Sequence, residues 1–150
     1  AGPDDPLPLA AGGQTLAPTI CYEDAYASDQ LSLIAGATLL VNVTNDAWFG
    51  DSTAPHQHLD ISRMRSLETG RPMLRATNDG ITALIAYDGR LLDTLPQFEP
   101  GVLTGVVEPR TGLTPYVRFG NAPVLVLVAL GLGAGLRSAR RRAGPRRRSR

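Results

Sequence analysis

The sequence contains no lysine, which limits the chemistry that the chain can do by itself. All fifteen basic residues among its 150 residues are arginine, although lysine is normally one of the commonest residues. The simplest explanation is a general bias toward arginine, but the chemical consequence does not depend on it. A reaction that needs an ammonium group must obtain that group from outside this chain.

Disulfide bonds are also excluded within the chain, because Cys21 is its only cysteine. With 43% apolar and 19% charged residues, the composition is typical of a folded protein of about one domain. No signal peptide is visible, and residues 1–6 read as a loop. We therefore expect the chain to be the carboxyl-terminal portion of a longer protein.

Acidic residues are absent from the end of the chain, and the net charge of +1 conceals this asymmetry. Residues 137–150 hold eight arginines and no acid, whereas residues 1–136 hold seven arginines against fourteen Asp and Glu, a net charge of −7. The folded body is therefore acidic. The basic run is either the flank of a membrane span or a nucleic-acid-binding tail, and the apolar stretch before it favours the membrane.

Apolar patterning predicts a mixed α/β sheet with helices on one side. Residues 1–15 are rich in proline and glycine and are expected to be irregular. Helices are predicted over residues 29–35 and 53–69. The predicted strands cover residues 16–20, 38–43, 73–77, 81–86, 91–95 and 102–107, with a hairpin turn at Asp88-Gly89.

The longer predicted helix has clear signals at both ends. Thr53 is its expected N-cap, and Gly70 follows its last residue. The helix is moderately amphipathic, since one stripe holds Ile61, Met64 and Glu68, with Leu67 adjacent.

Residues 119–136 are uncharged and long enough, at about 1.5 Å per residue, to cross the hydrocarbon core of a bilayer as a helix. A buried core helix can have the same length, but the arginine cluster that follows favours a transmembrane helix. By the positive-inside rule, residues 137–150 form a basic cytoplasmic tail, and residues 1–118 lie on the opposite side of the membrane.

Cys21 ends a predicted strand just before the chain turns into a helix. A thiol at such a turn can be exposed above a sheet edge, where backbone N–H groups stabilise the oxyanion of a tetrahedral intermediate. Acyl transfer through a thioester also needs a base for the thiol proton and a cation for the negative charge. The alternative is that this single cysteine is a small buried hydrophobic residue.

Other candidate residues follow the predicted strands. Glu23 and Asp24 can act as a local base or orient a substrate, or they can be acids favoured by a helix dipole, which suits Asp24 better. His56 and His58 have too few partners to indicate a metal site, so we expect them on the helix surface or satisfied in the core. Trp48 lies on a loop at a sheet end, where it serves either function or packing.

Several sequence blocks occur in one order over residues 16–136. They are Pro18-Thr19-Ile20-Cys21-Tyr22-Glu23, Asn45-Asp46-Ala47-Trp48-Phe49-Gly50, Arg63-Met64-Arg65-Ser66-Leu67-Glu68, Arg75-Ala76-Thr77-Asn78-Asp79-Gly80 and Thr111-Gly112-Leu113-Thr114-Pro115-Tyr116. The first two blocks alone indicate the nitrilase, or carbon-nitrogen hydrolase, superfamily. Together with the final apolar helix, the set resembles the apolipoprotein N-acyltransferase family.

This resemblance implies the carboxyl-terminal part of a nitrilase-like α-β-β-α sandwich in residues 16–118, followed by one transmembrane helix. It also implies an enzyme of the bacterial inner membrane, multi-pass as a whole, with its catalytic domain in the periplasm. The family moves an acyl chain from a phospholipid, typically phosphatidylethanolamine, to the diacylglyceryl-cysteine amine of an apolipoprotein. The implied partners are therefore the phospholipid donor, the apolipoprotein acceptor with its diacylglyceryl-cysteine, and the lipid bilayer, without nucleic acid.

The resemblance also assigns roles to residues. Cys21 is the nucleophile that becomes a thioester, Tyr22 offers its backbone N–H to the oxyanion, and Glu23 is needed for activity. The implied substrate-binding residues are Asn45, Trp48 and Phe49. No metal and no organic cofactor are implied.

The family's catalytic triad is Glu, Lys and Cys, and its Glu and Lys lie before the cysteine on segments that this chain lacks. We therefore expect the chain to be inactive by itself. Two alternatives remain. One is a carbon-nitrogen hydrolase, soluble or attached to a membrane, that uses water as its acceptor. The other is a non-catalytic module anchored in the membrane.

Overall fold

One mixed sheet organises the first part of the computed structural model, which describes residues 7–142. Its strands lie side by side in sequence order: β1 (Leu9–Ala11), β2 (Gln14–Ile20), β3 (Leu39–Asn45), β4 (Met73–Asn78), β5 (Thr82–Ile85) and β6 (Leu91–Leu95). The central strands β2, β3 and β4 are parallel. The outer pairings are antiparallel: β1 pairs with β2, β4 with β5, and β5 with β6. The predicted mixed sheet is confirmed.

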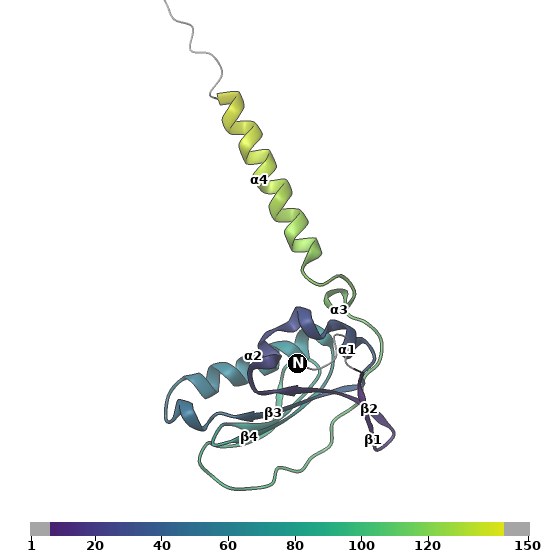
Figure 1. Ribbon diagram of the computed structural model, residues 1–150, viewed down its shortest axis with the longest axis vertical. Coiled ribbons are helices and arrows are strands. Elements are labelled where there is room, and N and C mark those ends of the chain that lie inside the picture. Colours follow the sequence, from purple (N-terminus) through teal and green to yellow (C-terminus); the bar gives the residue numbers. More distant parts are fainter. Residues whose placement is uncertain (1–6, 143–150) are drawn as a thin grey trace, which may run out of the picture. The chain divides into compact units, whose positions relative to one another are not determined.

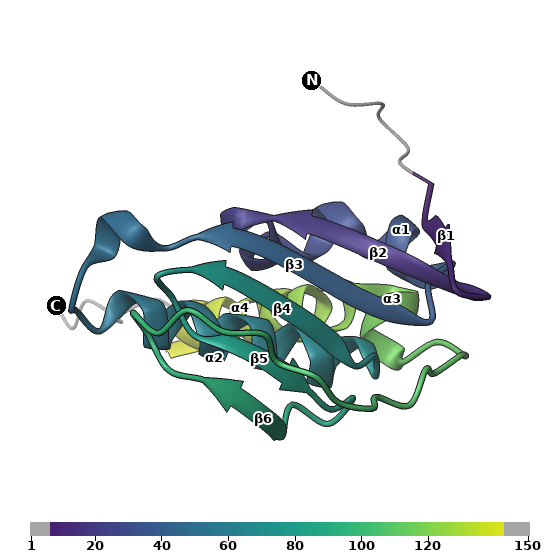
Figure 2. The ribbon, with the colours of Figure 1, turned by 90° about the horizontal axis from the view of Figure 1, so that it is seen from below.

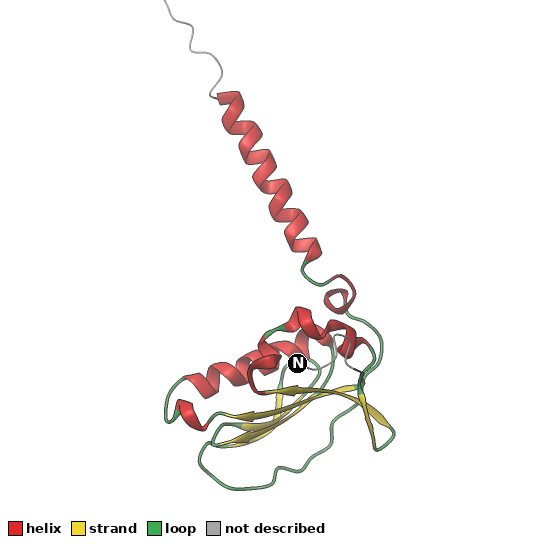
Figure 3. Ribbon diagram, in the orientation of Figure 1, coloured by secondary structure: helices red, strands yellow, loops and turns green. Residues whose placement is uncertain are grey.

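The helices that connect the parallel strands, α1 (Leu31–Ala35) and α2 (Ala54–Thr69), lie on one face of the sheet (Figures 1 and 3). Parallel neighbours need such a crossover connection. Short 3₁₀ helices complete the connections at Cys21–Ala25, Ala27–Gln30 and Ala47–Phe49. The expected arrangement of helices on one side is therefore confirmed for this sheet.

Side chains of the strands alternate between a face covered by helices and an open face. In β3, Leu40, Asn42 and Thr44 are buried, while Val43 between them is 46% exposed. The irregular segment 96–114 runs across the open face (Figure 2), where Gly105 lies against Leu84 of β5. The core on the covered face consists mainly of Ala17, Leu33, Ile34, Leu40, Leu59, Met73, Ala83 and Ile85.

The start of the chain is more regular than predicted. Residues 1–15 were expected to be irregular, but β1 begins at Leu9 and β2 begins at Gln14. Gly12 and Gly13 both have positive φ and close a hairpin between these strands, a backbone that glycine adopts without strain. Residues 1–6 lie outside the described residues.

The strand predicted over residues 102–107 is wrong, because this segment has no regular structure. Val102 is 87% exposed, and the segment pairs with none of the described strands. Gly105 interrupts the apolar pattern, and glycine weakens strand pairing. A short apolar segment therefore does not define a strand here.

The ends of α2 follow the expected boundaries, with one difference at the start. Thr53 makes no side-chain capping bond and has helical backbone angles, so its predicted capping role is wrong. Ser52 Oγ instead accepts a hydrogen bond from the N–H of Ala54 at 3.3 Å. Gly70, with φ of +64°, ends the helix in the left-handed conformation.

The buried face of α2 is mostly polar, and the stripe noted in the sequence is not the one that packs on the sheet. Met64 and Leu67 are about half exposed. The buried residues are Pro55, His58, Leu59, Ser62, Arg65, Ser66 and Thr69. Apolar residues therefore do not mark the face of this helix that packs on the sheet.

The chain divides after Arg118 into two compact units. A short helix, α3 (Pro115–Phe119), stands at the division, and the second unit contains the long helix α4 (Ala122–Arg142). The helix expected over residues 119–136 thus begins three residues later, because Gly120 with positive φ separates α3 from α4.

Helix α4 also continues beyond residue 136, so the first part of the expected tail is helical. Residues 122–139 have a mean hydropathy of 1.7, and none of this window is buried. By length and composition, the helix can cross a membrane. Residues 143–150 of the expected tail lie outside the described residues.

Candidate active site

Cys21 lies where β2 ends and the 3₁₀ helix Cys21–Ala25 begins. Its φ of +54° falls in the left-handed region that non-glycine residues rarely adopt. Such a backbone costs on the order of 1–3 kcal/mol and persists only where its surroundings hold it. The side chain is partly exposed, as a nucleophile on a strained strand-to-helix turn requires.

Three chain segments meet at the edge of the sheet that carries Cys21, because parallel strands end at the same edge. Cys21 follows β2, Asp46 follows β3, and Asn78 is the last residue of β4. The N–H of Asp46 donates to the carbonyl oxygen of Asn78 at 3.1 Å, which joins two of these segments. The predicted site residues after β2 and β3 therefore share one edge.

Two side chains hold the backbone on either side of Cys21. Glu23 Oε2 accepts a hydrogen bond from the N–H of Ile20 at 2.8 Å. Asn42 Nδ2 donates to the carbonyl oxygen of Cys21 at 3.1 Å. Glu23 thus ties the end of the strand to the turn, while its catalytic role stays a prediction.

A buried cluster of four charged residues adjoins this turn. His58 lies between two carboxylates, with Nε2 3.1 Å from Asp24 Oδ1 and Nδ1 3.0 Å from Asp46 Oδ1. Arg75 Nη2 donates to Asp46 Oδ2 at 2.9 Å, and its Nη1 lies 3.6 Å from Asp24 Oδ2. Once His58 is protonated, the two carboxylates are balanced by two cations, His58 and Arg75. Buried charges are tolerated when they are paired in this way.

The protonation of His58 is set by competing effects. Burial lowers the pKa of His58, since it disfavours the charged ring. The hydrogen bonds to Asp24 and Asp46 outweigh burial and raise the pKa of His58 to about 9. Burial raises the pKa of Asp46, but the hydrogen bond to His58 and the charge of Arg75 lower it overall. The ring therefore carries both protons at neutral pH.

Neutral polar groups complete the cluster. Ser62 Oγ donates to Asp24 Oδ2 and accepts from Arg75 Nη1 at 2.8 Å. Asn42 Oδ1 accepts a second hydrogen bond from Arg75 Nη1 at 2.7 Å. Thr44 Oγ1 donates to Asp46 Oδ1 at 3.0 Å. The turn that carries Cys21 is thereby connected to β3, β4 and α2.

Aromatic side chains lie exposed at the same edge of the sheet. Trp48 is 78% exposed, and its ring centre lies 6.4 Å from that of Phe49. The ring of Tyr22 lies 5.4 Å from the ring of His58. A cavity of about 380 Å³ is lined by Tyr22, Phe49, Ala54, Gln57, His58 and Ile61. These aromatic groups and the cavity adjoin the turn that carries Cys21.

The structure brings most of the predicted site residues together. Cys21, Tyr22 and Glu23 form the turn, and Trp48 and Phe49 lie in the 3₁₀ helix after β3. The structure adds detail for Asn45, whose Oδ1 accepts a hydrogen bond from the N–H of Ala47 at 3.1 Å. Asn45 thus shapes the loop that carries the aromatic residues.

Asp24 lies in the first turn of the 3₁₀ helix Cys21–Ala25, as one of its two interpretations expected. Its side chain is fully buried in the charged cluster, whereas Glu23 satisfies the backbone N–H of Ile20. His58 is the satisfied core histidine that the sequence allowed for, and His56 is exposed.

Sequence reasoning missed Asn42 and Arg75. A signal for both was present, since each interrupts a run of apolar residues within a predicted strand. Charged and amide side chains are rarely buried without partners. A polar residue within such a strand therefore predicts a buried network, although the sequence does not identify its other members.

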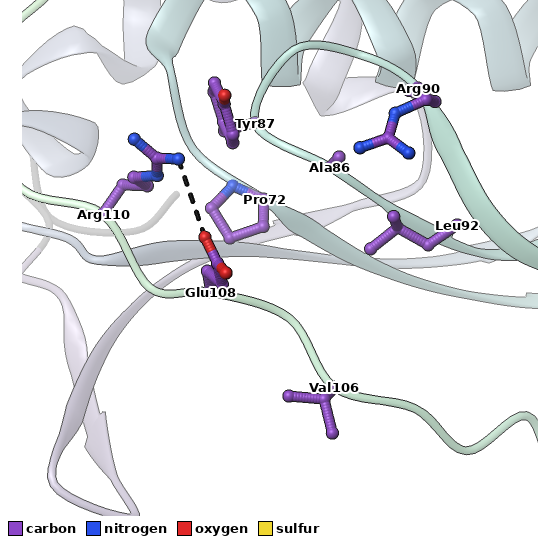
Figure 4. A pocket seen from close by; sticks show the side chains of 8 residues that line it. All are labelled: Pro72, Ala86, Tyr87, Arg90, Leu92, Val106, Glu108 and Arg110. Atoms are coloured by element: carbon purple, nitrogen blue, oxygen red, sulfur yellow. Dashed lines mark ion pairs between the residues drawn. The ribbon is translucent and has the colours of Figure 1, made fainter.

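A second cavity, of about 290 Å³, lies at the opposite end of the sheet, where Pro72 precedes β4 and Ala86 follows β5. Figure 4 shows its lining, with Arg110 paired to Glu108 at 3.6 Å. The guanidinium of Arg110 also lies 3.7 Å from the ring centre of Tyr87. These groups include no thiol or imidazole, so the candidate active site remains the edge with Cys21.

Comparison with known proteins agrees with this fold. A family model described as carbon-nitrogen hydrolase matches residues 5–116, and the chain belongs to this family. The predicted nitrilase-like α/β fold is therefore confirmed.

The curated relatives are more specific. The chain is 52% identical over 131 residues to the apolipoprotein N-acyltransferase of Nitrosomonas europaea, which covers 87% of this chain and 26% of that protein. It is 52% identical over 143 residues to the enzyme of the same name from Ralstonia nicotianae. That match covers 93% of this chain and 27% of the relative. The chain spans about a quarter of the length of these relatives.

Solved structures with the same fold include the amidase from Nesterenkonia sp., with a TM-score of 0.54 and 27% identity over 67% of this chain and 40% of that one. A mutant of the Nesterenkonia sp. AN1 amidase, with a TM-score of 0.55 and 27% identity, covers the same shares of the two chains. It shows covalent addition of the acetamide moiety of fluoroacetamide at its active-site cysteine.

Proposed function

We propose that this chain carries the nucleophile and the oxyanion site of an apolipoprotein N-acyltransferase. The observation that carries this proposal is the strained turn at Cys21, which leaves a partly exposed thiol at the edge of the parallel sheet. The identity of about 50% to enzymes of that name supports the choice of reaction. Covalent addition at the cysteine of the related amidase supports Cys21 as the nucleophile.

The proposed reaction has two steps. In the first, the thiolate of Cys21 attacks the ester carbonyl carbon of a phospholipid, which we propose to be phosphatidylethanolamine. The N–H of Tyr22 stabilises the oxyanion. The ester C–O bond then breaks, the lysophospholipid oxygen takes a proton from a general acid, and the acyl chain remains on sulfur. In the second step, the diacylglyceryl-cysteine amine attacks the thioester, loses its proton to the base and releases the thiolate.

The general base and an ammonium group come from elsewhere in the whole protein in this proposal. The sequence has no lysine, and the acids that follow Cys21 are engaged. Glu23 accepts from Ile20, and Asp24 accepts from His58 and Ser62. We therefore propose that Glu23 supports activity by holding the turn and that the chain alone is inactive.

Both substrates in this reaction carry lipid chains, which explains the apolar helix α4 and the exposed aromatic residues. We propose that α4 spans the bacterial inner membrane, with its basic end in the cytoplasm and the sheet on the periplasmic side. Membrane anchoring confines enzyme and lipids to one plane and so favours their encounter. The exposed Trp48 and Phe49, together with Asn45, are proposed to border the lipid substrate.

Intact-mass spectrometry of the full-length protein tests this function. After mixing with phosphatidylethanolamine vesicles, we expect the protein to gain the mass of one acyl chain, and hydroxylamine to remove it as it removes thioesters. The Cys21→Ser variant should gain no hydroxylamine-labile mass. A hydroxylamine-labile acyl adduct in Cys21→Ser would contradict the assignment of the nucleophile.

An amidase or nitrilase that uses water as its acceptor is the second candidate, favoured by the likeness to the Nesterenkonia sp. amidase. The same acyl-enzyme distinguishes the two functions. A diacylglyceryl-cysteine peptide should discharge it much faster than buffer alone if the protein is an acyltransferase. Equal rates with and without the peptide support the hydrolase.

A further inference from the structure

The peptide unit between Cys21 and Tyr22 is held from its carbonyl side by a buried donor. Asn42, which is fully buried, donates from Nδ2 to the Cys21 oxygen at 3.1 Å. A trans peptide is planar, and its C=O and N–H point in opposite directions. Fixing the carbonyl of Cys21 therefore fixes the direction of the Tyr22 N–H.

The orientation of Asn42 is set in turn by Arg75. A guanidinium can only donate hydrogen bonds, and Arg75 Nη1 lies 2.7 Å from Asn42 Oδ1. The amide nitrogen of Asn42 must therefore face the other way, toward Cys21 and toward Thr19 Oγ1 at 2.9 Å. Arg75 is itself held by Asp46 and Ser62.

The Tyr22 N–H has no partner within its own helix. It belongs to the first turn of the 3₁₀ helix Cys21–Ala25, and the first N–H groups of a helix have no acceptor inside it. A hydrogen bond to the carbonyl of a peptide also polarises its N–H, since chains of hydrogen bonds strengthen one another. The contact with Asn42 therefore both aims this donor and strengthens it.

We infer that Asn42, oriented by Arg75, is a positioning residue for the oxyanion site, because it holds the strained Cys21–Tyr22 peptide with its N–H directed at the developing negative charge. This inference rests on the proposed function, in which Cys21 attacks a carbonyl group. Neither Asn42 nor Arg75 needs to contact the substrate. Their effect is confined to steps that form an oxyanion.

Two reactions of the same thiol separate this role from a structural one. A p-nitrophenyl ester acylates Cys21 through a tetrahedral oxyanion, whereas iodoacetamide alkylates it by direct displacement of iodide without one. The ratio of the two rates cancels any change in the fraction of thiolate. Removing an oxyanion donor outright costs about 10² to 10³ in rate. For a donor that is loosened rather than removed, we expect the Asn42→Leu variant of the full-length protein to lose at least about tenfold in this ratio.

Thr19→Val is the matched control, because it removes the other acceptor of the same Asn42 amide and leaves the Cys21 contact in place. Its rate ratio should stay within about twofold of the wild type, well short of the loss of an oxyanion donor. Asn42→Asp keeps the shape of the side chain but cannot donate to Cys21. Its ratio of acylation rate to alkylation rate should therefore fall as that of Asn42→Leu does. It serves as a second test if Asn42→Leu fails to fold.

The outcomes of this experiment are distinct. A wild-type rate ratio in both Asn42 variants overturns the inference, and so does an equal fall of acylation and alkylation. If the wild-type protein is alkylated at Cys21 but never acylated, the proposed function fails, and the inference fails with it. If the wild type is acylated and the rate ratio falls only in the Asn42 variants, the proposed function and the inference about Asn42 are both supported.

Discussion

Cys21 has a strained backbone, and the charged residues buried next to it balance one another. A left-handed backbone at a cysteine is costly, and here Glu23 and Asn42 hold it on both sides. Behind it, Asp24, His58 and Arg75 lie in the buried cluster that Asp46 completes. Breaking such a set by removing one partner leaves an uncompensated charge, which is strongly destabilising. The backbone position of Cys21 therefore depends on residues that lie behind the turn.

The raised pKa of His58 predicts how stability changes with pH. Its pKa is about 9 when folded, against an ordinary value of 6.5, so protonation stabilises the folded state. This contribution is fully present below about pH 6.5 and is lost as the pH rises through 9. By the conversion of pKa differences, it amounts to at most about 3 kcal/mol. The thermal unfolding midpoint of the full-length protein should fall across this window.

The matched variants for this prediction lie on one helix. His58→Gln removes the titrating ring from the cluster, so its midpoint should be lower at pH 6.5 and should change less between pH 6.5 and 9. His56→Gln replaces the exposed histidine two residues earlier and should behave as the wild type does. The same pH dependence in all three proteins would rule out His58 as its source.

At the scale of single elements, α2 shows how a site can override hydrophobic patterning. Its apolar residues Met64 and Leu67 are about half exposed, while Ser62 and Ser66 are fully buried. A helix normally buries its apolar stripe. Here the face toward the sheet is used for polar contacts with Asp24 and Arg75 instead.

This inverted face predicts an unusual pair of truncations in α2. Ser62→Ala removes the hydroxyl that donates to Asp24 and accepts from Arg75. Each buried polar group left without a partner costs about 1–3 kcal/mol. Met64→Ala removes a larger apolar side chain that is about half exposed, so it should cost within about 0.5 kcal/mol. Denaturant unfolding of the full-length variants measures both costs. The idea fails if Met64→Ala proves the more damaging change.

At the scale of the whole molecule, the open face of the sheet leaves apolar side chains exposed. The side chains of Val43 and Ala76 are register partners on neighbouring strands, and both are exposed. An apolar sheet face of this kind normally packs against another layer. In the α-β-β-α sandwich that the family resemblance implies, a second sheet packs on this face.

The open face predicts self-association when the sheet-bearing unit is produced alone. Residues 7–118 should form oligomers at micromolar concentration in analytical ultracentrifugation, because large apolar patches associate in water. Val43→Glu combined with Ala76→Glu should shift this piece toward the monomer. Met64→Glu, on the outer side of α2, is the control and should not. A monomeric wild-type piece, or an equal effect of the control, would contradict the prediction.

The sequence by itself determined the order of the central elements, the turn at Cys21 and the apolar helix near the end of the chain. These features depend on local signals: strand and helix periods, glycine at turns and runs of uncharged residues. Residues 102–107 mark the limit of such signals, since an apolar pattern there has no strand to pair with.

Only the tertiary structure decided the charged cluster and the face that α2 buries. Asp24, Asp46, His58 and Arg75 come from four separate segments of the chain, and no segment by itself shows which residues of the other three it contacts. Their partners are identified only when parallel strands and α2 bring these segments to one edge of the sheet. A buried charge is stable because of the opposite charges around it, and that pairing is a property of the fold rather than of any short stretch of sequence.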